Sequence, residues 1–240
     1  MINNLSYFIL YMRWSIEDFV YGGTDGVITT FAIVAGAFGA SLSVSVILIL
    51  GFANLFADGF SMSIGNYLSR RTYIEYIEKE RKKEEWSIDN LIEEEKEEIR
   101  EIYKNKGFKD DLLEDLVKVI TSKRKVWIDT MMKEELGLVD DKKEPKDTAI
   151  TTFIAFNLLG LIPLIPFIII HLIGITSISS SNAFIFSSIF TAISFFLIGI
   201  VKGKIVKKSW IQSGLHTLAI GGVASAVAYT IGYTLSIYIK

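Results

Sequence analysis

Acidic side chains occur in two predominantly apolar stretches of the chain, although inserting an ionised carboxylate into a bilayer costs about 2.5 to 3.5 kcal/mol. They belong to two polar stripes whose members are three or four residues apart, so that each stripe lies on one face of a helix. The first stripe contains Asp18, Gly22, Asp25 and Thr29, and the second contains Asn54, Asp58, Met62 and Asn66. Carboxylate oxygens with a thioether sulfur suit a borderline divalent ion such as Fe(II) better than Mg²⁺ or Ca²⁺. The stripes therefore predict a water-accessible metal path between two membrane-spanning helices.

Ordinary structural roles remain open for three members of these stripes. Asp18 could cap a helix at the membrane interface, and Asp58 could bond a neighbouring serine. Met62 could fill a gap in the packing, as methionine often does. Asp25 lies deeper within its apolar stretch, where a carboxylate is harder to accommodate, and a functional role is therefore favoured most strongly for this residue.

A second set of acidic residues lies in the segment 70–147, which holds 19 of the 25 Lys and Arg residues and 23 of the 27 Asp and Glu residues. Here Glu95 and Glu98 occupy a helical stripe where an amphipathic helix normally places leucine or isoleucine. That stripe contains Leu91, Glu95, Glu98 and Ile102, and a later one contains Ile128, Met132, Glu135 and Val139. The phase of both stripes predicts inward-facing carboxylates.

Inward-facing carboxylates cost several kcal/mol unless a cation neutralises them. A divalent metal ion would supply that cation, and Met131 and Met132 beside Glu134 and Glu135 offer sulfur and oxygen together. The alternative is a helical hairpin held by ion pairs, because Lys and Arg are plentiful in the same segment. The segment is therefore predicted either to collect metal ions or to be held by its own salt bridges.

The elements that position these residues follow from the distribution of charge. The chain has 240 residues, of which 50% are apolar and 22% charged, yet residues 148–201 contain no Asp, Glu, Lys or Arg. A membrane span requires about 20 mostly apolar helical residues. Five spans are predicted, near residues 18–39, 43–69, 149–173, 183–201 and 210–238. A single water-soluble core is excluded.

We therefore predict an all-α protein: a five-helix transmembrane bundle with a cytoplasmic three-helix metal-binding domain inserted between spans two and three. The expected parts are residues 1–70 (an interfacial helix over 1–14 and spans one and two), residues 71–147 (the metal-binding domain) and residues 148–240 (spans three to five). The helices expected in the middle part cover residues 67–86, 90–106 and 110–136, with glycines as stop signals.

The positions of the cations predict the orientation, because short cytoplasmic loops retain Lys and Arg. The connection between spans four and five contains Lys202, Lys204, Lys207 and Lys208, whereas the loop at residues 174–182 contains neither Lys nor Arg. With five spans, the amino terminus and the charged segment then lie in the cytoplasm and Lys240 lies outside. In a prokaryote, the membrane would be the plasma membrane.

Several classes of function are excluded or disfavoured. The absence of cysteine excludes disulfides, thiolate zinc sites and cysteine nucleophiles. No nucleophile paired with a base, phosphate-binding loop or cofactor fingerprint is visible, so we expect neither an enzyme nor a tightly bound cofactor, and no nucleic-acid partner. The alternative to a transporter is a membrane-anchored metal sensor or buffer that binds through residues 70–147 and transports nothing.

Four motifs resemble those of the vacuolar iron transporter family, over about residues 17–240. In order, they are residues 22–30 (GGTDGVITT), residues 57–69 (ADGFSMSIGNYLS), Glu95 and Glu98 followed by Ile102 and Tyr103, and residues 131–137 (MMKEELG). The resemblance implies a homodimer with five spans per subunit. It also implies movement of Fe(II), or a similar divalent ion, out of the cytoplasm in exchange for protons.

The resemblance also implies roles for individual residues. It matches Asp25 and Met62 to transport-path ligands and Asp18 to an acidic residue on the same face; with the second stripe, the predicted path comprises Asp18, Asp25, Asn54, Asp58 and Met62. The cytoplasmic ligands that it implies are Glu84, Glu95, Glu98, Met131, Met132 and Glu135. The sequence departs from the family where Asn54 and Asn66 replace glutamates and where Ser87 replaces another ligand, for which Glu80 or Glu85 would substitute.

Overall fold

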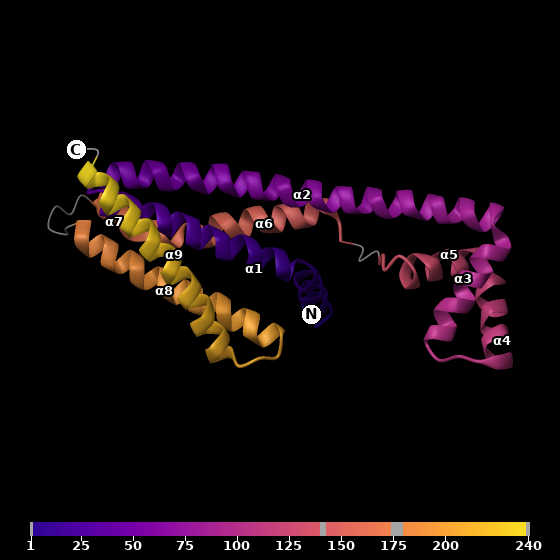
Figure 1. Cartoon of the computed structure of the whole chain (residues 1–240). Coiled ribbons are helices and arrows are strands. Elements are labelled where there is room, and N and C mark those ends of the chain that lie inside the picture. Colours follow the sequence, from indigo (N-terminus) through magenta and orange to yellow (C-terminus); the bar gives the residue numbers. More distant parts are fainter. Residues whose placement is uncertain (1, 140–142, 174–179, 239–240) are drawn as a thin grey trace. The chain divides into compact units, whose positions relative to one another are not determined.

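The computed structural model describes residues 2–139, 143–173 and 180–238, and every regular element in these ranges is a helix (Figure 1). The α-helices are α1 (Ile2–Gly39), α2 (Val44–Asn90), α3 (Ile92–Asn105), α4 (Asp110–Thr121), α5 (Arg124–Glu134), α6 (Pro145–Gly160), α7 (Ile165–Ile173), α8 (Ser180–Ile205) and α9 (Trp210–Tyr238), with a short 3-10 helix, η1 (Ile162–Leu164). The prediction of an all-α protein is confirmed.

Five helical segments of the described chain are long and apolar enough to cross a membrane, as predicted. They are Ile16–Gly39, Val44–Asn90, Pro145–Leu172, Ser180–Lys204 and Trp210–Tyr238. The expected interfacial helix over residues 1–14 is not a separate element, because no glycine or proline divides it from the rest of α1. The turn expected at residues 174–182 lies mostly outside the described residues.

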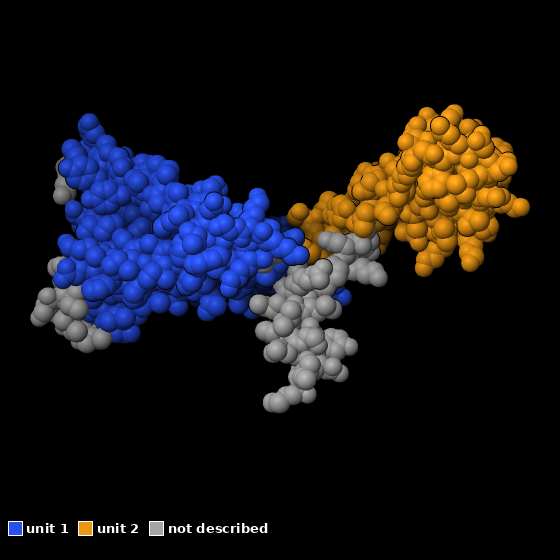
Figure 2. Space-filling view, turned by 90° about the horizontal axis from the view of Figure 1, so that it is seen from below, with its two compact units in different colours: residues 1–67, 144–240 blue, residues 68–143 orange. Residues whose placement is uncertain are grey.

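The chain divides into two compact units, which Figure 2 distinguishes by colour. The first, called the membrane unit below, consists of Met1–Tyr67 and Glu144–Lys240. The second, called the charged unit, consists of Leu68–Lys143.

Within the membrane unit, α1 packs against α6, α8 and α9. Its side chain Phe31 joins an apolar cluster with residues of α2, α6, η1, α7 and α8. Glycine lets α1 and α6 approach closely, since a Cβ atom added at Gly22 would lie 2.6 Å from the carbonyl oxygen of Thr152, and one added at Gly26 would collide with that of Phe156. Small residues at such contacts are typical of membrane helices. The contact fixes the face of α1 that carries the acidic stripe.

The third span is interrupted between α6 and α7. Pro163 and Pro166 have no backbone N–H to donate, and the chain forms the 3-10 turn η1 at this point. The Ser187 hydroxyl of α8 donates to the carbonyl oxygen of Pro163 over 2.6 Å. A neighbouring helix thus satisfies a carbonyl group at the interruption, as the interior of a bilayer requires.

In the charged unit, the last turns of α2 and the helices α3, α4 and α5 share one apolar cluster. The single helix predicted over residues 110–136 is wrong, because α4 and α5 are separate helices. The Ser122 hydroxyl donates a hydrogen bond to the carbonyl oxygen of Val119 in the preceding turn. The backbone of Lys123 is extended, with φ −126° and ψ 110°. The break lets both helices contribute to the cluster, through side chains such as Ile120 and Trp127.

Candidate functional site

The two polar stripes of the membrane unit adjoin one another. The carboxylates of Asp25 in α1 and Asp58 in α2 are close enough for electrostatic repulsion between them, and both side chains are half-buried. Farther along the stripes, Nδ2 of Asn54 donates to Oγ1 of Thr29 over 3.3 Å. The Thr29 hydroxyl in turn donates to the carbonyl oxygen of Asp25 over 2.9 Å. Oxygen atoms from two neighbouring spans therefore line the same contact.

Met62 lies one turn beyond Asp58 on the same helix. Its side chain is half-buried and packs against the apolar cluster that contains Phe31 and Phe156. This packing is the role that methionine most often has in a core. A ligand role for its sulfur depends on its position in the stripe beside Asp58.

Asp18 and Asn66 form a second contact between the stripes, and α6 takes part in it. Nδ2 of Asn66 donates to Oδ1 of Asp18 over 2.9 Å and to Oγ1 of Thr152 over 2.8 Å. Because α1 begins at Ile2, Asp18 lies inside the helix, and the capping role considered for it is wrong. Thr152 could not be identified from the sequence, since a threonine in an apolar helix usually forms a hydrogen bond with the backbone of its own helix.

Two glutamates of the charged unit are buried. Glu84 in α2 is 5% exposed and Glu95 in α3 is 6% exposed, and Oε2 of each has no hydrogen-bond partner. Glu98 and Glu135 are exposed, because Ile99 completes the inward face of α3 and Glu135 lies beyond the end of α5. The inward orientation predicted from the stripes is correct for Glu95 and wrong for Glu98 and Glu135.

These four carboxylates nevertheless interact as one group, called the carboxylate group below. Burial of the Glu95 carboxyl, followed by repulsion from Glu98, Glu84 and Glu135, raises its pKa from 4.5 to about 7. Partial burial of the Glu135 carboxyl and repulsion from Glu98 and Glu84 raise the pKa of that residue as well. A divalent cation would relieve both the repulsion and the cost of burial.

The ion pairs found in the charged unit involve acidic residues other than those of the carboxylate group. They join Arg81 to Asp129, Arg100 to Glu97 and Glu114, Lys106 to Glu134, and Arg124 to Asp89. Among the ion pairs of the described residues, none involves a member of the carboxylate group. The alternative of a hairpin held by ion pairs therefore applies to the surface acids and not to these four.

Met131 and Met132 are 0% and 2% exposed and belong to the apolar cluster of the charged unit. Their sulfur atoms therefore lie in the interior of the charged unit. Across the described ranges, no three His, Asp or Glu side chains converge closely enough to hold a metal ion as they stand. Ligation by the carboxylate group would thus require its side chains to move together.

Ser87, Glu80 and Glu85 differ in how they act on the carboxylate group. The Ser87 hydroxyl lies near the Glu95 carboxyl, where it favours the ionised form and partly offsets the rise in the pKa of Glu95. Glu80 adds to the electrostatic repulsion at Glu84, whereas Glu85 acts on a surface arginine instead. Of the two glutamates considered as substitutes for a ligand at Ser87, Glu80 is the one that interacts with the group.

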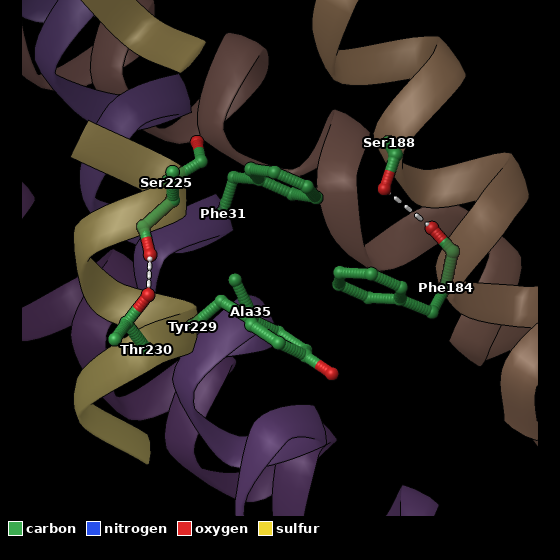
Figure 3. Close-up of a pocket in the computed structure, with 8 residues that line it drawn as sticks. Phe31, Ala35, Phe184, Ser188, Ser225, Tyr229 and Thr230 are labelled. Carbon is green, nitrogen blue, oxygen red and sulfur yellow. Dashed lines mark hydrogen bonds between the residues drawn. The ribbon is translucent and has the colours of Figure 1, made fainter. Parts of the chain in front are cut away.

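A separate cavity of about 350 Å³ lies between α1, α8 and α9 (Figure 3). It is lined by Phe31, Ala35, Phe184, Ser188, Ser225, Ala226, Tyr229 and Thr230. The hydroxyl groups of Ser188, Ser225 and Thr230 donate to carbonyl oxygens of their own helices. The lining contains no acidic side chain, so this cavity offers no carboxylate ligand and is distinct from the acidic stripes.

Comparison with known proteins gives consistent matches over nearly the whole chain. The model of a family described as "VIT family" matches residues 16–233. A vacuolar iron transporter of Toxoplasma gondii (strain ATCC 50861 / VEG) is 36% identical over 230 residues, covering 93% of this chain and 75% of that one. One from Plasmodium falciparum (isolate 3D7) is 32% identical over 226 residues (92% and 82%), and vacuolar iron transporter 1 of Arabidopsis thaliana is 32% identical over 217 residues (89% and 83%).

Proposed function

The chain belongs to the VIT family, and from that premise we propose that it carries Fe(II), or a similar divalent ion, out of the cytoplasm in exchange for protons. Membership makes it a multi-pass membrane protein that transports metal ions, rather than an enzyme, and makes the metal its substrate rather than a resident cofactor. The choice of Fe(II), the direction and the proton coupling are the proposed parts.

The observation that carries the proposal is the pairing of Asp25 with Asp58 between two spans of the membrane unit. Two half-buried carboxylates that repel each other are unfavourable in a membrane protein unless a cation or protons occupy the space between them. Thr29 and Asn54 place further oxygen atoms along the same contact, and Met62 places a sulfur atom one turn away. The path therefore has the donors that a borderline divalent ion prefers.

Exchange would follow from competition between metal and protons. A carboxylate binds a metal ion only in its deprotonated form, so protons that arrive from one side displace metal that arrived from the other. The proton gradient would then supply the free energy for uphill transport. The carboxylate group of the charged unit would raise the metal concentration near the cytoplasmic mouth, with Met131 and Met132 as sulfur donors.

The remaining parts of the proposal concern orientation and assembly. Four exposed lysines, in the last turns of α8 and in the connection to α9, support a cytoplasmic position for that connection, for the amino terminus and for the charged unit. The carboxy terminus would then lie outside the cytoplasm, and the membrane would be the plasma membrane if the organism is a prokaryote. We further propose a homodimer embedded in lipid. A sensor or buffer without transport is disfavoured, because the curated relatives are named as transporters.

Transport by proteoliposomes with an acidic interior tests this proposal. The wild type should take up Fe(II) with a matching rise of internal pH, and Asp25→Asn should reduce uptake to the rate of protein-free vesicles, because the variant keeps the shape of the side chain and removes its charge. Asp115→Asn, which neutralises an exposed carboxylate of α4, is the matched control and should transport normally. Undiminished uptake by Asp25→Asn would refute the assignment of the path.

A further inference from the structure

The hydrogen bonds around Asn66 have one consistent set of directions. The Thr152 hydroxyl donates its only hydrogen to the carbonyl oxygen of Thr148 over 2.8 Å. Its contact with Asn66, also at 2.8 Å, must then use an oxygen lone pair, so the NH₂ group of Asn66 points towards it. The same NH₂ group donates to Oδ1 of Asp18 over 2.9 Å. The amide therefore presents a donor, and not its own oxygen, to the Asp18 carboxylate.

The surroundings hold this amide in place. Thr152 is fully buried, and its own bond to the backbone of α6 fixes its hydroxyl. One turn from Asp18, Gly22 packs directly against the backbone of Thr152, so α1 cannot move away from α6 without losing that contact. Three spans, α1, α2 and α6, are thereby joined at the one side chain of Asn66.

We infer that Asn66 is a positioning residue, which orients the Asp18 carboxylate for a passing divalent ion at one end of the path; this inference rests on the proposed function. A carboxylate offers about four lone-pair sites, and the bond from Asn66 occupies one of them. The hydrogen bond restricts rotation of the carboxylate and so sets the direction in which its oxygen atoms face. Asn66 itself adds no charge and needs no contact with the metal.

Metal concentration dependence of uptake tests the inference. Hydrogen-bond partners of metal-binding carboxylates typically contribute 10- to 100-fold to metal affinity, so Asn66→Leu should raise the KM for Fe(II) by about tenfold or more. The leucine keeps the approximate size of the side chain and removes its donors, so the maximal rate should change by no more than about twofold. Asn66→Gln, which restores the NH₂ group, should recover most of the affinity.

Ser63→Ala supplies the matched control. Ser63 lies one turn before Asn66 and joins α2 to α6 through a bond to the carbonyl oxygen of Ala149 over 2.9 Å, a contact that does not involve a carboxylate. Its removal should leave the KM within about twofold of the wild-type value. If Ser63→Ala raised the KM as much as Asn66→Leu, the contacts at Asn66 would serve only helix packing and the inference would be wrong.

Two further results separate the inference from the proposed function. No uptake by the wild type would contradict the proposed function, and the inference with it. Wild-type uptake together with an unchanged KM in Asn66→Leu would contradict the inference alone. Should Asn66→Leu fail to fold, judged by its thermal midpoint in detergent, Asn66→Ala removes the same donors without adding bulk, and an unchanged KM in that variant would overturn the inference equally.

Discussion

At the scale of single residues, Glu95 shows how the fold alters the chemistry of a side chain. Burial and three neighbouring carboxylates all favour its protonated form, which gives it a pKa of about 7 in place of 4.5. The folded chain thus binds this proton more tightly than the unfolded chain does. Without metal, the contribution of Glu95 to the free energy of unfolding therefore falls as the pH rises from 4.5 to about 7. A bound divalent cation should stabilise the ionised Glu95 carboxylate and so restore this contribution to the free energy of unfolding.

We expect metal binding to the charged unit to strengthen with pH. Below pH 7 the metal must displace the Glu95 proton, so the apparent Kd for Mn(II) should fall by about tenfold between pH 6 and pH 8 for one released proton. Quenching of the buried Trp127 would report binding, and Trp127→Phe identifies the part of the signal that comes from it. Glu95→Gln should bind more weakly and lose this pH dependence; a Kd that stayed constant with pH in the wild type would contradict the assignment.

At the scale of helices, close contact between α1 and α6 determines where the acidic stripe points. Glycines on α1 allow backbone to pack against backbone, and a hydroxyl from α8 satisfies a carbonyl group where prolines interrupt the third span. Each contact depends on a side chain that is small or that donates to a particular backbone oxygen. Such positions tolerate little change in volume, because membrane helices associate largely through close packing.

Gly26→Ala should therefore destabilise the membrane unit. The added methyl group would collide with the carbonyl oxygen of Phe156, which cannot move without shifting α6, and overpacking of this kind costs about 1 to 3 kcal/mol. The measurement is the thermal midpoint in detergent, which should be lower than that of the wild type. Gly65→Ala is the matched control, since its methyl group would meet no atom within 4 Å; equal midpoints for the two variants would contradict this account.

At the scale of the whole molecule, the chain combines two units of opposite character. The membrane unit contains four of the five candidate spans, the first part of the other (α2) and few charges, whereas the charged unit contains most of the acidic and basic residues. Each unit has its own apolar cluster. The carboxylates of the proposed path lie in one unit and the carboxylate group in the other, so we propose separate roles for them in transport and in collection.

Replacing residues 72–143 with a short flexible linker tests this division of roles. The shortened protein should keep measurable Fe(II) uptake at high metal concentration, because Asp25 and Asp58 remain, and its KM should rise, because the carboxylate group is lost. Uptake into proteoliposomes as a function of Fe(II) concentration measures both. Complete loss of transport in a shortened protein that is still folded would show that the charged unit is part of the path.

Periodicity and hydropathy were sufficient to predict the number of spans and three of the candidate acidic residues. Long uncharged runs give the number of spans, since only helices of about 20 apolar residues can cross a bilayer alone. Helical spacing identified Asp25, Asp58 and Glu95, because residues three or four apart share a face whatever the rest of the chain does. Composition alone separated the charged segment from the spans.

Only the tertiary structure decided which of these faces meet. Thr152 joins Asn66 across 86 residues of sequence, a contact that no local spacing could indicate. Glu98 and Glu135 follow the same period as buried residues and yet are exposed, because the ends and directions of α3 and α5 depend on packing around a shared cluster. Helical periodicity determines which residues share a face of one helix. Which other helices pack against that face depends on the fit between segments that are far apart in the chain.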